Sequence, residues 1–440
     1  MNCQNRSEYV QRLAELSRKR EALRAEKYGK LVSILGKEAV LSLKEYFDLY
    51  DESLYLWFSG LWDNGIGAFY YSNSARDTEW YLPDIESTVQ IMRALVSVGL
   101  IPNGKMSENI PAWLRDRLVS FAQGLQDKDD GYFYMPQWGK EEITTSRRGR
   151  DLYWCVGFLE ELGEKPLYPT PISVGTKKAP SLPEHLCSTD AFKSYLSGLD
   201  MGKMSYHHGN LLQSQAWQIK AAGEEFVDIL ISWLDENQNR DNGLWQDEVN
   251  YNSVNGLMKI SLVYSQLGRP IPNTMVALKS AIQAAVSDEK LGFICEVYNP
   301  LVCIQCLLSS VKKTEGDDAV NKLRAELYKS AATLIRITTE KMKKFRKDDG
   351  SFSYHLHSSA ARSQGAPIAP AGNNEGDANS TTIAAAGVTN TILKIFNIDS
   401  FPLYIFEEGE LLFELMAGLA PVEKKIYSEP PELLPPQFKV

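Results

Sequence analysis

Residues 61–101 read LWDNGIGAFYYSNSARDTEWYLPDIESTVQIMRALVSVGLI, and the fold prediction depends on this stretch. It contains the turn sequence Asp63-Asn-Gly65, an aromatic segment around Phe69 and a charged loop. After the loop, Asp84 precedes a run of apolar residues at helical spacing, and Asp is a favoured residue at the N-terminus of a helix. We therefore expect a tight turn, an aromatic segment, a loop and a capped helix, in that order.

The same order of features recurs along the chain. Turn sequences like Asp63-Asn-Gly65 occur at Asp129-Asp-Gly131, Asp241-Asn-Gly243 and Asp348-Asp-Gly350, and an aromatic residue closely follows each of them. Two weaker copies lie between these turns. The glycines of all six units span 285 residues in five steps, a mean period of 57, at Gly65, Gly131, Gly202, Gly243, Gly292 and Gly350. A repeat of this length has room for two helices of about four turns each and their connections.

The segments between the turns have helical periodicity, and no long segment alternates as a strand would. The expected helix pairs are 86–98 with 113–125, 211–222 with 225–237, 254–267 with 274–286, and 302–311 with 320–340, and 381–395 ends the series. The sequence thus predicts an all-α fold in which six helical hairpins close into a ring, an (α/α)6 toroid with DG-aromatic turns. Its inner helices should be apolar on most faces, and its outer helices should be amphipathic.

The two ends of the chain and one internal segment depart from the repeat. Residues 7–46 have the periodicity of two helices. We expect N-terminal helices over 1–59, a toroid body over 60–400 with an inserted loop at about 163–181, and a C-terminal segment over 401–440. The tail of that segment is rich in proline, and we expect it to lie extended on the surface.

Two of the turns carry a recognisable motif. Gln126-Asp-Lys-Asp-Asp-Gly-Tyr-Phe133 and Gln238-Asn-Arg-Asp-Asn-Gly-Leu-Trp245 resemble the Gln…Asp-Gly…Trp repeats of the terpenoid cyclase and protein prenyltransferase α/α-toroid superfamily. Phe345-Arg-Lys-Asp-Asp-Gly-Ser-Phe352 is a looser copy. The resemblance implies the architecture from about residue 60 to 395. It does not imply one reaction, because this motif is structural and toroids serve several chemistries, six-hairpin carbohydrate-active enzymes among them.

Composition narrows the classes of partner. The 440 residues are 44% hydrophobic and 23% charged with a formal net charge of −9, which argues against nucleic acid as the main partner. No apolar run reaches the roughly 18 residues of a membrane span, and the start of the chain lacks the apolar core of a signal peptide, so we expect a cytoplasmic protein. The basic run at 18–27 shares a predicted helix with Glu15, Glu21 and Glu26, and we interpret it as a solvated face.

The cysteines give no indication of a metal or redox site. Six are scattered along the chain without a disulfide framework. Cys303 and Cys306 form one CxxC pair on an apolar helix face with no second pair, which favours core packing over zinc. We expect neither a metal nor a cofactor, and the oligomeric state stays open.

If the ring closes as predicted, the residues between each turn and the next helix gather at one mouth. Asn, Tyr, His, Arg and carboxylate side chains are frequent there, and four of the five histidines fall there in two pairs. Such a mouth suits a polyhydroxylated ligand, because each hydroxyl needs a donor or an acceptor. The predicted partners are a small-molecule or oligosaccharide substrate, and the predicted substrate-binding residues are Tyr70, Tyr71, Arg76, Asp77, Trp138, Arg150, Asn210, Asn252, Tyr298, His355, Arg362 and Asn379.

We predict a carbohydrate-active enzyme that cleaves a glycosidic bond of an acidic oligosaccharide. A lyase would use Tyr or His as base and acid, with Asn and Arg neutralising a uronate carboxylate. A hydrolase would use two carboxylates on opposite sides of the sugar. The histidines and arginines favour the lyase slightly. The predicted catalytic residues are Tyr206, His207, His208, Asp84, Glu86, Glu375 and Asp377. Helix capping is the alternative role for Asp84, Asn210, Asn252, Asn299 and Asn379.

Two other function classes stay open: an isoprenoid-converting enzyme like the terpenoid cyclases, and a non-catalytic toroid that binds a ligand at its mouth. Asp127-Lys-Asp-Asp130 matches the Asp-x-Asp-Asp acid motif of class II terpene cyclases, but its last residue belongs to a DG turn, so we interpret it as turn chemistry. A prenyltransferase-like zinc site would need a cysteine near His207 or His355, and the sequence has none there.

Overall fold

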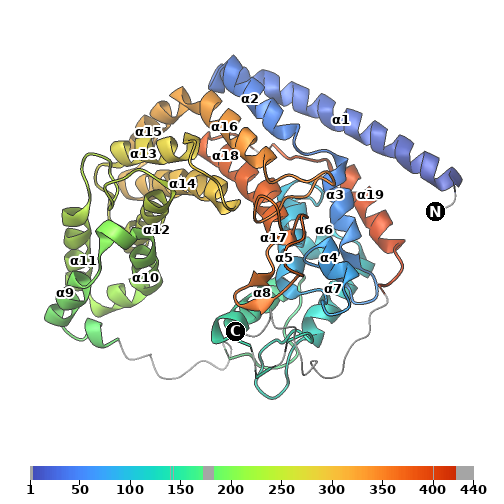
Figure 1. Ribbon diagram of the computed structural model, residues 1–440, viewed down its shortest axis with the longest axis horizontal. Coiled ribbons are helices and arrows are strands. Elements are labelled where there is room, and N and C mark those ends of the chain that lie inside the picture. Colours follow the sequence, from blue (N-terminus) through green and yellow to red (C-terminus); the bar gives the residue numbers. More distant parts are fainter. Residues whose placement is uncertain (1–2, 139, 142, 172–182, 400, 423–440) are drawn as a thin grey trace.

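Figure 1 shows the computed structural model, which describes residues 3–138, 140–141, 143–171, 183–399 and 401–422. Helices make up most of these residues, and the described strands form only two hairpins of two-residue strands. The predicted all-α class is therefore confirmed. Among the described helices, none combines the length and the apolar surface that a bilayer crossing requires.

One curved layer of helices follows the concave side of the arc in Figure 1. Its members pack side by side although they come from distant parts of the chain: α10 contacts α12, α12 contacts α14, α14 contacts α18, α17 contacts α5, and α5 contacts α8. A π-helical segment joins α17 to α18. In the described residues α8 and α10 make no extensive contact, so the layer is open between them. The bounds are α5 (Ile85–Ser97), α8 (Thr145–Glu161), α10 (Met201–Ala222), α12 (Tyr251–Leu267), α14 (Cys295–Glu315), α17 (Ala378–Thr382), the π segment (Ile383–Val388) and α18 (Thr389–Ile395).

A second layer covers the convex side. In it α11 packs on α10, α13 on α14, and α7 on α8, while α16 joins α13 to α2. The predicted helix over 320–340 is in fact two helices, because the backbone leaves the helical conformation at Ser330. The bounds of this layer are α2 (Lys37–Phe47), α3 (Glu52–Gly60), α7 (Ala112–Gly124), α9 (Thr189–Ser197), α11 (Glu224–Asn237), α13 (Thr274–Val286), α15 (Asp317–Lys329) and α16 (Ala331–Lys343).

The two layers differ in burial as their positions require. In α12 the six consecutive residues 253–258 are all buried, so this helix is enclosed on most faces. In α11 the buried residues are Val227, Leu230 and Leu234, which form one stripe at helical spacing. The core therefore lies between the layers, and the inner helices close it from the concave side.

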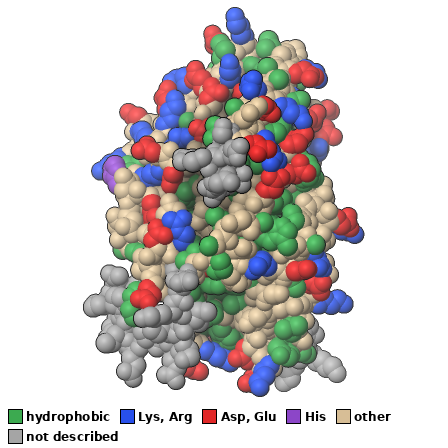
Figure 2. Space-filling model, turned by 90° about the vertical axis from the view of Figure 1, so that its right-hand side faces the viewer, with side chains coloured by type: hydrophobic (Ala, Val, Ile, Leu, Met, Phe, Trp, Pro, Cys, Tyr) green, Lys and Arg blue, Asp and Glu red, His purple; other side chains and the backbone are tan. Residues whose placement is uncertain are grey.

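The long helix α1 (Cys3–Leu35) and the C-terminal helix α19 (Phe406–Ala417) lie at the edge of this body, and the prediction of two helices over 7–46 is confirmed by α1 and α2. The basic run on α1 is not simply a solvated face. Arg20 is buried and pairs with Glu408 of α19, and Arg24 is buried and donates to the carbonyl of Leu403. One face of the run thus holds the C-terminal segment. On the molecular face turned to the viewer in Figure 2, by contrast, acidic and basic side chains are interspersed.

Short elements connect the helices. The strands β1 and β2 pair Trp62 with Phe69, and β3 and β4 pair Arg362 with Pro367. The predicted loop at 163–181 is non-helical as far as residue 171, and its remaining residues lie outside the described part, as does the tail from 423 onward. The bounds are β1 (Trp62–Asp63), β2 (Ala68–Phe69), β3 (Arg362–Ser363), β4 (Ala366–Pro367), α4 (Asn73–Asp77), α6 (Met106–Asn109) and a 3-10 turn (Glu184–Leu186).

Two turns of the repeat share the same hydrogen bonds. Gly131 and Gly243 have φ values of 73° and 69°, and the N–H of each donates to the carbonyl of the residue four positions earlier, at 3.0 and 2.8 Å. The side-chain amides of Gln126 and Gln238 donate to the carbonyls of these glycines, at 3.2 and 2.9 Å, and also to a carbonyl of a neighbouring loop. The Gln and Gly of the motif therefore fix one turn conformation.

In the first unit the equivalent glycine is Gly67, so the prediction of Gly65 for this position is wrong. Gly67 has a φ of 82°, and its N–H donates to the carbonyl of Asp63 at 2.8 Å. Phe69 then follows the glycine by two residues, as the aromatic does after Gly131, Gly243 and Gly350. The Asp63 side chain supports this turn as Asp127 does in the second unit, because its Oδ1 accepts from the N–H groups two and three positions later, those of Gly65 and Ile66.

The two weaker copies do not form this turn. Gly202 lies in the first turn of α10, because the side chain of Asp200 accepts from the N–H of Lys203 and starts the helix there. Gly292 lacks a positive φ, and its N–H donates to the side chain of Glu296. The chain thus repeats its helix pairs more regularly than its turns.

Gly131→Ala should destabilise the protein by about 2 kcal/mol or more. An L residue is strained at this φ, and a Cβ would lie 2.1 Å from the carbonyl oxygen of Pro169. Gly29→Ala in α1 is the matched control: no atom lies within 4 Å of its Cβ position, and Ala is favoured in a helix, so stability should stay unchanged or rise by up to about 1 kcal/mol. Urea unfolding measures both, and equal stabilities for the two variants would contradict the turn assignment.

Candidate functional site

The inner helices α5 and α17 begin with the same arrangement. Asp84 precedes α5, and its side chain accepts a hydrogen bond from the N–H of Ser87 at 3.0 Å. Asp377 precedes α17 and accepts from the N–H of Ser380 at 2.8 Å. Each carboxyl group satisfies an N–H that the first turn of a helix leaves unpaired. The predicted capping role of Asp84 is confirmed.

A threonine in each helix ties the helix to the preceding turn. The Oγ atom of Thr88 accepts from the N–H of Phe69 at 3.0 Å, and that of Thr381 accepts from the N–H of Phe352 at 2.9 Å. The sequences DIEST at 84–88 and DANST at 377–381 therefore occupy equivalent positions. Because α5 and α17 pack side by side, the third residues of these motifs, Glu86 and Asn379, come to one place.

Glu86 and Asn379 both line a polar pocket of about 290 Å³. This volume is at the lower end of the range for small-molecule sites. The pocket lies at the N-terminal ends of α5 and α17, with one wall from α8 and another from the irregular segment 354–368. The other lining residues are Tyr71, Asp84, Ser87, Gln90, Arg150, Tyr354, Ala360, Arg362, Ser363, Gln364 and Ile368.

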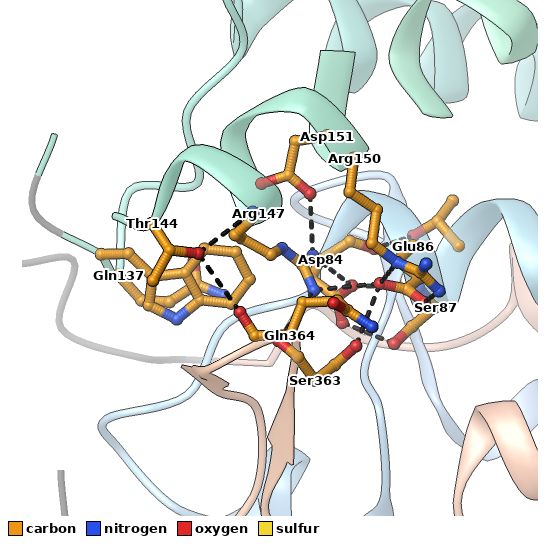
Figure 3. Close-up of polar contacts among 12 residues, drawn as sticks. Asp84, Glu86, Ser87, Gln137, Thr144, Arg147, Arg150, Asp151, Ser363 and Gln364 are labelled. Carbon is orange, nitrogen blue, oxygen red and sulfur yellow. Dashed lines mark hydrogen bonds and ion pairs between the residues drawn. The ribbon is translucent and has the colours of Figure 1, made fainter. Parts of the chain in front are cut away.

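Behind this pocket, the buried guanidinium of Arg147 faces three acidic side chains (Figure 3). Its Nη1 donates to Oε2 of Glu86 at 2.9 Å. Its Nη2 lies 2.8 Å from Oδ1 of Asp151 and 3.8 Å from Oδ1 of Asp84. The guanidinium also lies over the ring of Trp138, with 4.5 Å between Cζ and the ring centroid. Arg147 thus joins α8 to the start of α5.

Glu86 is held from several sides. Arg150 donates to both of its carboxylate oxygens, with the Nε–Oε2 distance at 2.9 Å, and Ser363 donates to Oε2 at 3.1 Å. The carboxylate is therefore fixed by α8 and by the strand that carries Ser363. A group held in this way has one orientation when a ligand arrives.

The protonation states follow from the balance of charge, because two guanidinium groups face three carboxyl groups in a buried place. Burial raises the pKa of Asp151 to about 7 and also raises the pKa of Asp84. Burial acts on Glu86 in the same direction, but the hydrogen bonds and charges of Arg150 and Arg147 outweigh it and hold its pKa below the usual value. Of the three carboxyl groups, Glu86 is the one whose pKa is held below its usual value, so it is ionised near neutral pH.

Another buried carboxyl group, that of Asp377, lies between the start of α17 and Tyr71 of the first unit. The phenol of Tyr71 hydrogen-bonds to Asp377, and Oδ2 of Asp377 accepts from the N–H of Tyr354 at 3.0 Å. Burial raises the pKa of Asp377 to about 6. Asp377 is fully buried by these contacts and does not line the pocket, so it positions Tyr71 and Tyr354 around it.

The structure brings together eight of the predicted site residues. Six of them line the pocket and two lie directly behind it. The lining residues are Tyr71, Asp84, Glu86, Arg150, Arg362 and Asn379, and the residues behind are Trp138 and Asp377. They come from units one, two and six of the predicted repeat, and their grouping as the mouth of a toroid stays a prediction.

The other predicted residues do not line this pocket, and any functional role for them stays a prediction. Tyr206, His207, His208 and Asn210 lie on α10, with His207 and Asn210 exposed, Asn252 is exposed on α12, and Tyr298 packs from α14 against Gly387. Tyr70 donates to Asp63, Arg76 pairs with Asp77, His355 bonds through its backbone to Ser358, and Glu375 accepts from Ser74.

The predicted capping residues are partly displaced by two positions. Asn250 caps α12 in place of Asn252, and Asp377 caps α17 in place of Asn379. Asn210 and Asn299 lie inside helices, and Asn299 donates to the phenol of Tyr251 at 3.0 Å. The displacement leaves Asn379 and Asn252 two residues after the cap, the position that Glu86 occupies in α5.

Several residues of the pocket were missed from the sequence. The helix α8 was not predicted, because its polar start with Gly149 has weak periodicity, although Thr144 does cap it by accepting from the N–H of Arg147. Gln90 and Ser87 follow from Glu86 along α5, and the recurrence of DIEST as DANST was a usable signal. Tyr354 and the segment after it carried no periodic signal.

Comparisons with known proteins identify no relative: no family model, no curated protein and no solved structure matches this chain. Within the described residues, no group of three or more His, Cys, Asp or Glu side chains is placed to hold a metal ion. The interpretation of the site therefore rests on its own geometry.

Arg147→Met should destabilise the protein by about 3–5 kcal/mol, because it leaves Glu86 and Asp151 in a buried place without their shared cation. Arg148→Met, the neighbouring position on α8, removes a half-buried guanidinium that lies 4.8 Å from the ring centroid of Tyr132, and should cost about 1 kcal/mol or less. Chemical unfolding of both variants measures the difference, and a mild effect at position 147 would contradict the central role of this guanidinium.

Asp151→Asn should change how stability depends on pH. In the unfolded chain Asp titrates near its usual pKa of about 3.9, whereas the folded pKa is about 7, so the folded state holds the proton over this window. Stability from this group is therefore greatest below about pH 4 and falls as pH rises toward 7. Relative to wild type, the variant should gain on the order of 2 kcal/mol between pH 5 and pH 8. Unfolding at both pH values tests this, with exposed Asp129→Asn as the control that should show no such gain.

Proposed function

We propose that this protein is a carbohydrate-active enzyme of the α/α-toroid type that binds an acidic oligosaccharide in the pocket at α5 and α17 and cleaves a glycosidic bond there by elimination. The toroid assignment is supported by the two curved helix layers and by the repeated turns at Gly67, Gly131 and Gly243. Among the described residues, the ring that this assignment implies is open between α8 and α10. The observation that carries the function is the convergence of Glu86, Arg150, Arg362, Asn379 and Tyr354 on one small polar pocket.

The pocket chemistry suits a sugar that bears a carboxylate. Gln90, Asn379 and Ser87 offer donors and acceptors for hydroxyl groups. The guanidinium groups of Arg150 and Arg362 line the pocket with that of Arg147 behind it, and burial raises the pKa values of Asp84 and Asp151, which weakens the negative charge opposing them. Arginine is suited to bind a carboxylate in a defined plane. An isoprenoid would instead need an apolar lining, and Ile368 and Ala360 are the aliphatic residues of this one.

The placement of the carboxylates favours elimination over hydrolysis. The two that line the pocket, Asp84 and Glu86, both belong to the start of α5, so both approach a ligand from the same wall. Hydrolysis by two carboxylates needs them on opposite sides of the scissile bond. Asp377 is enclosed and caps α17, and the segment 354–368 contributes a phenol, that of Tyr354, to the pocket lining.

We assign proton donation to Tyr354. Burial raises the pKa of its phenol, so the group is neutral and can give a proton to the glycosidic oxygen as the bond to it breaks. Glu86, the ionised carboxylate, is the candidate to accept the proton from C5 of the uronate ring. Arg362 and Asn379 would neutralise the sugar carboxylate, which stabilises the negative charge that develops next to C5. The proposal replaces the histidines of α10 by a tyrosine as the acid.

Tyr354→Phe should lower kcat on uronate oligosaccharides by about 10²–10⁴-fold while ligand affinity changes little, because the substitution removes the donor and keeps the ring. The assay follows the absorbance of the unsaturated product over a panel of uronate oligosaccharides. Tyr134→Phe is the control, since its phenol bonds to Asp130 in the turn at 2.9 Å and it does not line the pocket. Unsaturated product formed equally by Tyr354→Phe would contradict the assignment, and new reducing ends without unsaturated product would indicate hydrolysis.

A non-catalytic sugar-binding role is the second candidate, and one observation favours it. Asp84 and Asp377 cap helices and Glu86 is held in ion pairs, so each of these carboxyl groups already has a structural role. Calorimetric titration with the same oligosaccharides separates the two. Binding without turnover supports this second candidate, and the absence of both binding and turnover over the panel overturns the carbohydrate proposal.

A further inference from the structure

A second polar pocket lies on a different part of the molecule, between α14, α15 and the end of α18. Its volume is about 300 Å³, and it shares no lining residue with the pocket at α5 and α17. The lining residues are Gln305, Leu308, Ser309, Lys312, Arg324, Lys394, Ile395, Asn397, Ile398 and Asp399.

Three cations converge on this pocket from three different helices. Lys312 comes from α14, Arg324 from α15 and Lys394 from α18, and Asp399 is the one carboxylate among the lining residues. Like charges repel one another when they are brought together, and the repulsion grows where solvent is partly excluded. The pocket therefore has a local excess of positive charge, although the chain as a whole is negative, and a bound anion would compensate it.

Helix ends account for two of these cations but not for the third. Lys312 and Lys394 lie in the last turns of α14 and α18, where the carbonyl end of a helix attracts positive charge, and Lys312 also lies 3.3 Å from Asp317. Arg324 lies in the middle of α15. Its Nε atom is buried and has no hydrogen-bond partner within the described residues, and none of the ion pairs found there includes its guanidinium. A guanidinium without an ion pair, in a pocket that two further cations line, can bind an anionic ligand.

We propose that this pocket binds a phosphate group carried by a small organic molecule. The planar fork of Arg324 can donate two parallel hydrogen bonds to phosphate oxygens, while Lys312 and Lys394 act as mobile point charges. Ser309 and Asn397 add neutral polar groups to the lining. The volume is sufficient for a phosphate and leaves room for part of the molecule that carries it.

The adjoining surface indicates that the organic part is at least partly apolar. A hollow of about 460 Å³ shares Lys394 and Ile398 with the phosphate pocket, so the two are neighbours. The aliphatic and aromatic residues of this hollow include Ile101, Leu393 and Phe401. A ligand with its phosphate at Arg324 and its organic part at Leu393 would occupy both. The inference is independent of the proposed lyase activity.

Isothermal titration of the full-length protein with inorganic phosphate and with phenyl phosphate tests this proposal. Wild type should bind phenyl phosphate about tenfold more tightly than inorganic phosphate, because only the ester reaches the apolar hollow. Arg324→Gln should weaken both by about tenfold or more, and Arg324→Lys by less, because it keeps the charge and loses the fork. Lys322→Gln is the matched control: it removes one exposed cation from the same helix and does not line the pocket, so affinity should stay within about twofold.

Each other outcome counts against the site. No phosphate binding by wild type at concentrations on the order of 1 mM overturns the proposal. Equal losses in Arg324→Gln and Lys322→Gln mean unspecific attraction to the cations of α15, and the built pocket is then rejected. Equal affinity for inorganic phosphate and phenyl phosphate rejects the apolar part of the ligand. Unchanged unfolding midpoints of the variants exclude misfolding as the cause of a loss, and should Arg324→Gln unfold, the comparison of Arg324→Lys with Lys322→Gln decides.

Discussion

The candidate site depends on one buried cation. Arg147 reaches Glu86 across 61 positions of sequence and Asp151 across one turn of its own helix, so it fixes α8 against the start of α5. A buried guanidinium is tolerated only where carboxylates compensate it, and carboxylates in such a place ionise only where a cation compensates them. Here the two requirements meet, and the result is a carboxylate, Glu86, that stays charged at the edge of a pocket while its neighbours Asp84 and Asp151 are driven toward their neutral forms.

The turns of the repeat determine the position of the Glu86 carboxylate. The positive φ of Gly67 closes the turn, the aromatic Phe69 follows, and the N–H of Phe69 is bound by Thr88 of α5. The same relation links Gly350, Phe352 and Thr381 of the last unit. Because each turn thus fixes the start of its inner helix, two units that are far apart in sequence present their third motif residues at one place.

These relations between turns, helix starts and the buried arginine explain how much of the structure the sequence could predict. The helix pairs, the all-α class and the cap at Asp84 follow from local patterns, namely apolar spacing and the preference of Asp for helix N-termini. Six pocket-lining residues were also predicted, because they follow turns that recur. What could not be predicted is contact between units: the pairing of Arg147 with Glu86 is set by packing, and local patterns do not report on it. The start of α8 and the segment carrying Tyr354 lack periodicity, so their part in the pocket had no sequence signal.

The repeat also shows where function can diverge from scaffold. In α5, α17 and α12 the capping residue and the serine three positions later are retained as Asp84, Asp377 and Asn250 with Ser87, Ser380 and Ser253, because the helix start needs them. The residue two positions after the cap takes no part in capping and differs among the three helices: Glu86, Asn379 and Asn252. Glu86 and Asn379 line the pocket at α5 and α17, and Asn252 does not. The position two residues after the cap is therefore the one at which the identity of the side chain can change while the start of the helix is kept.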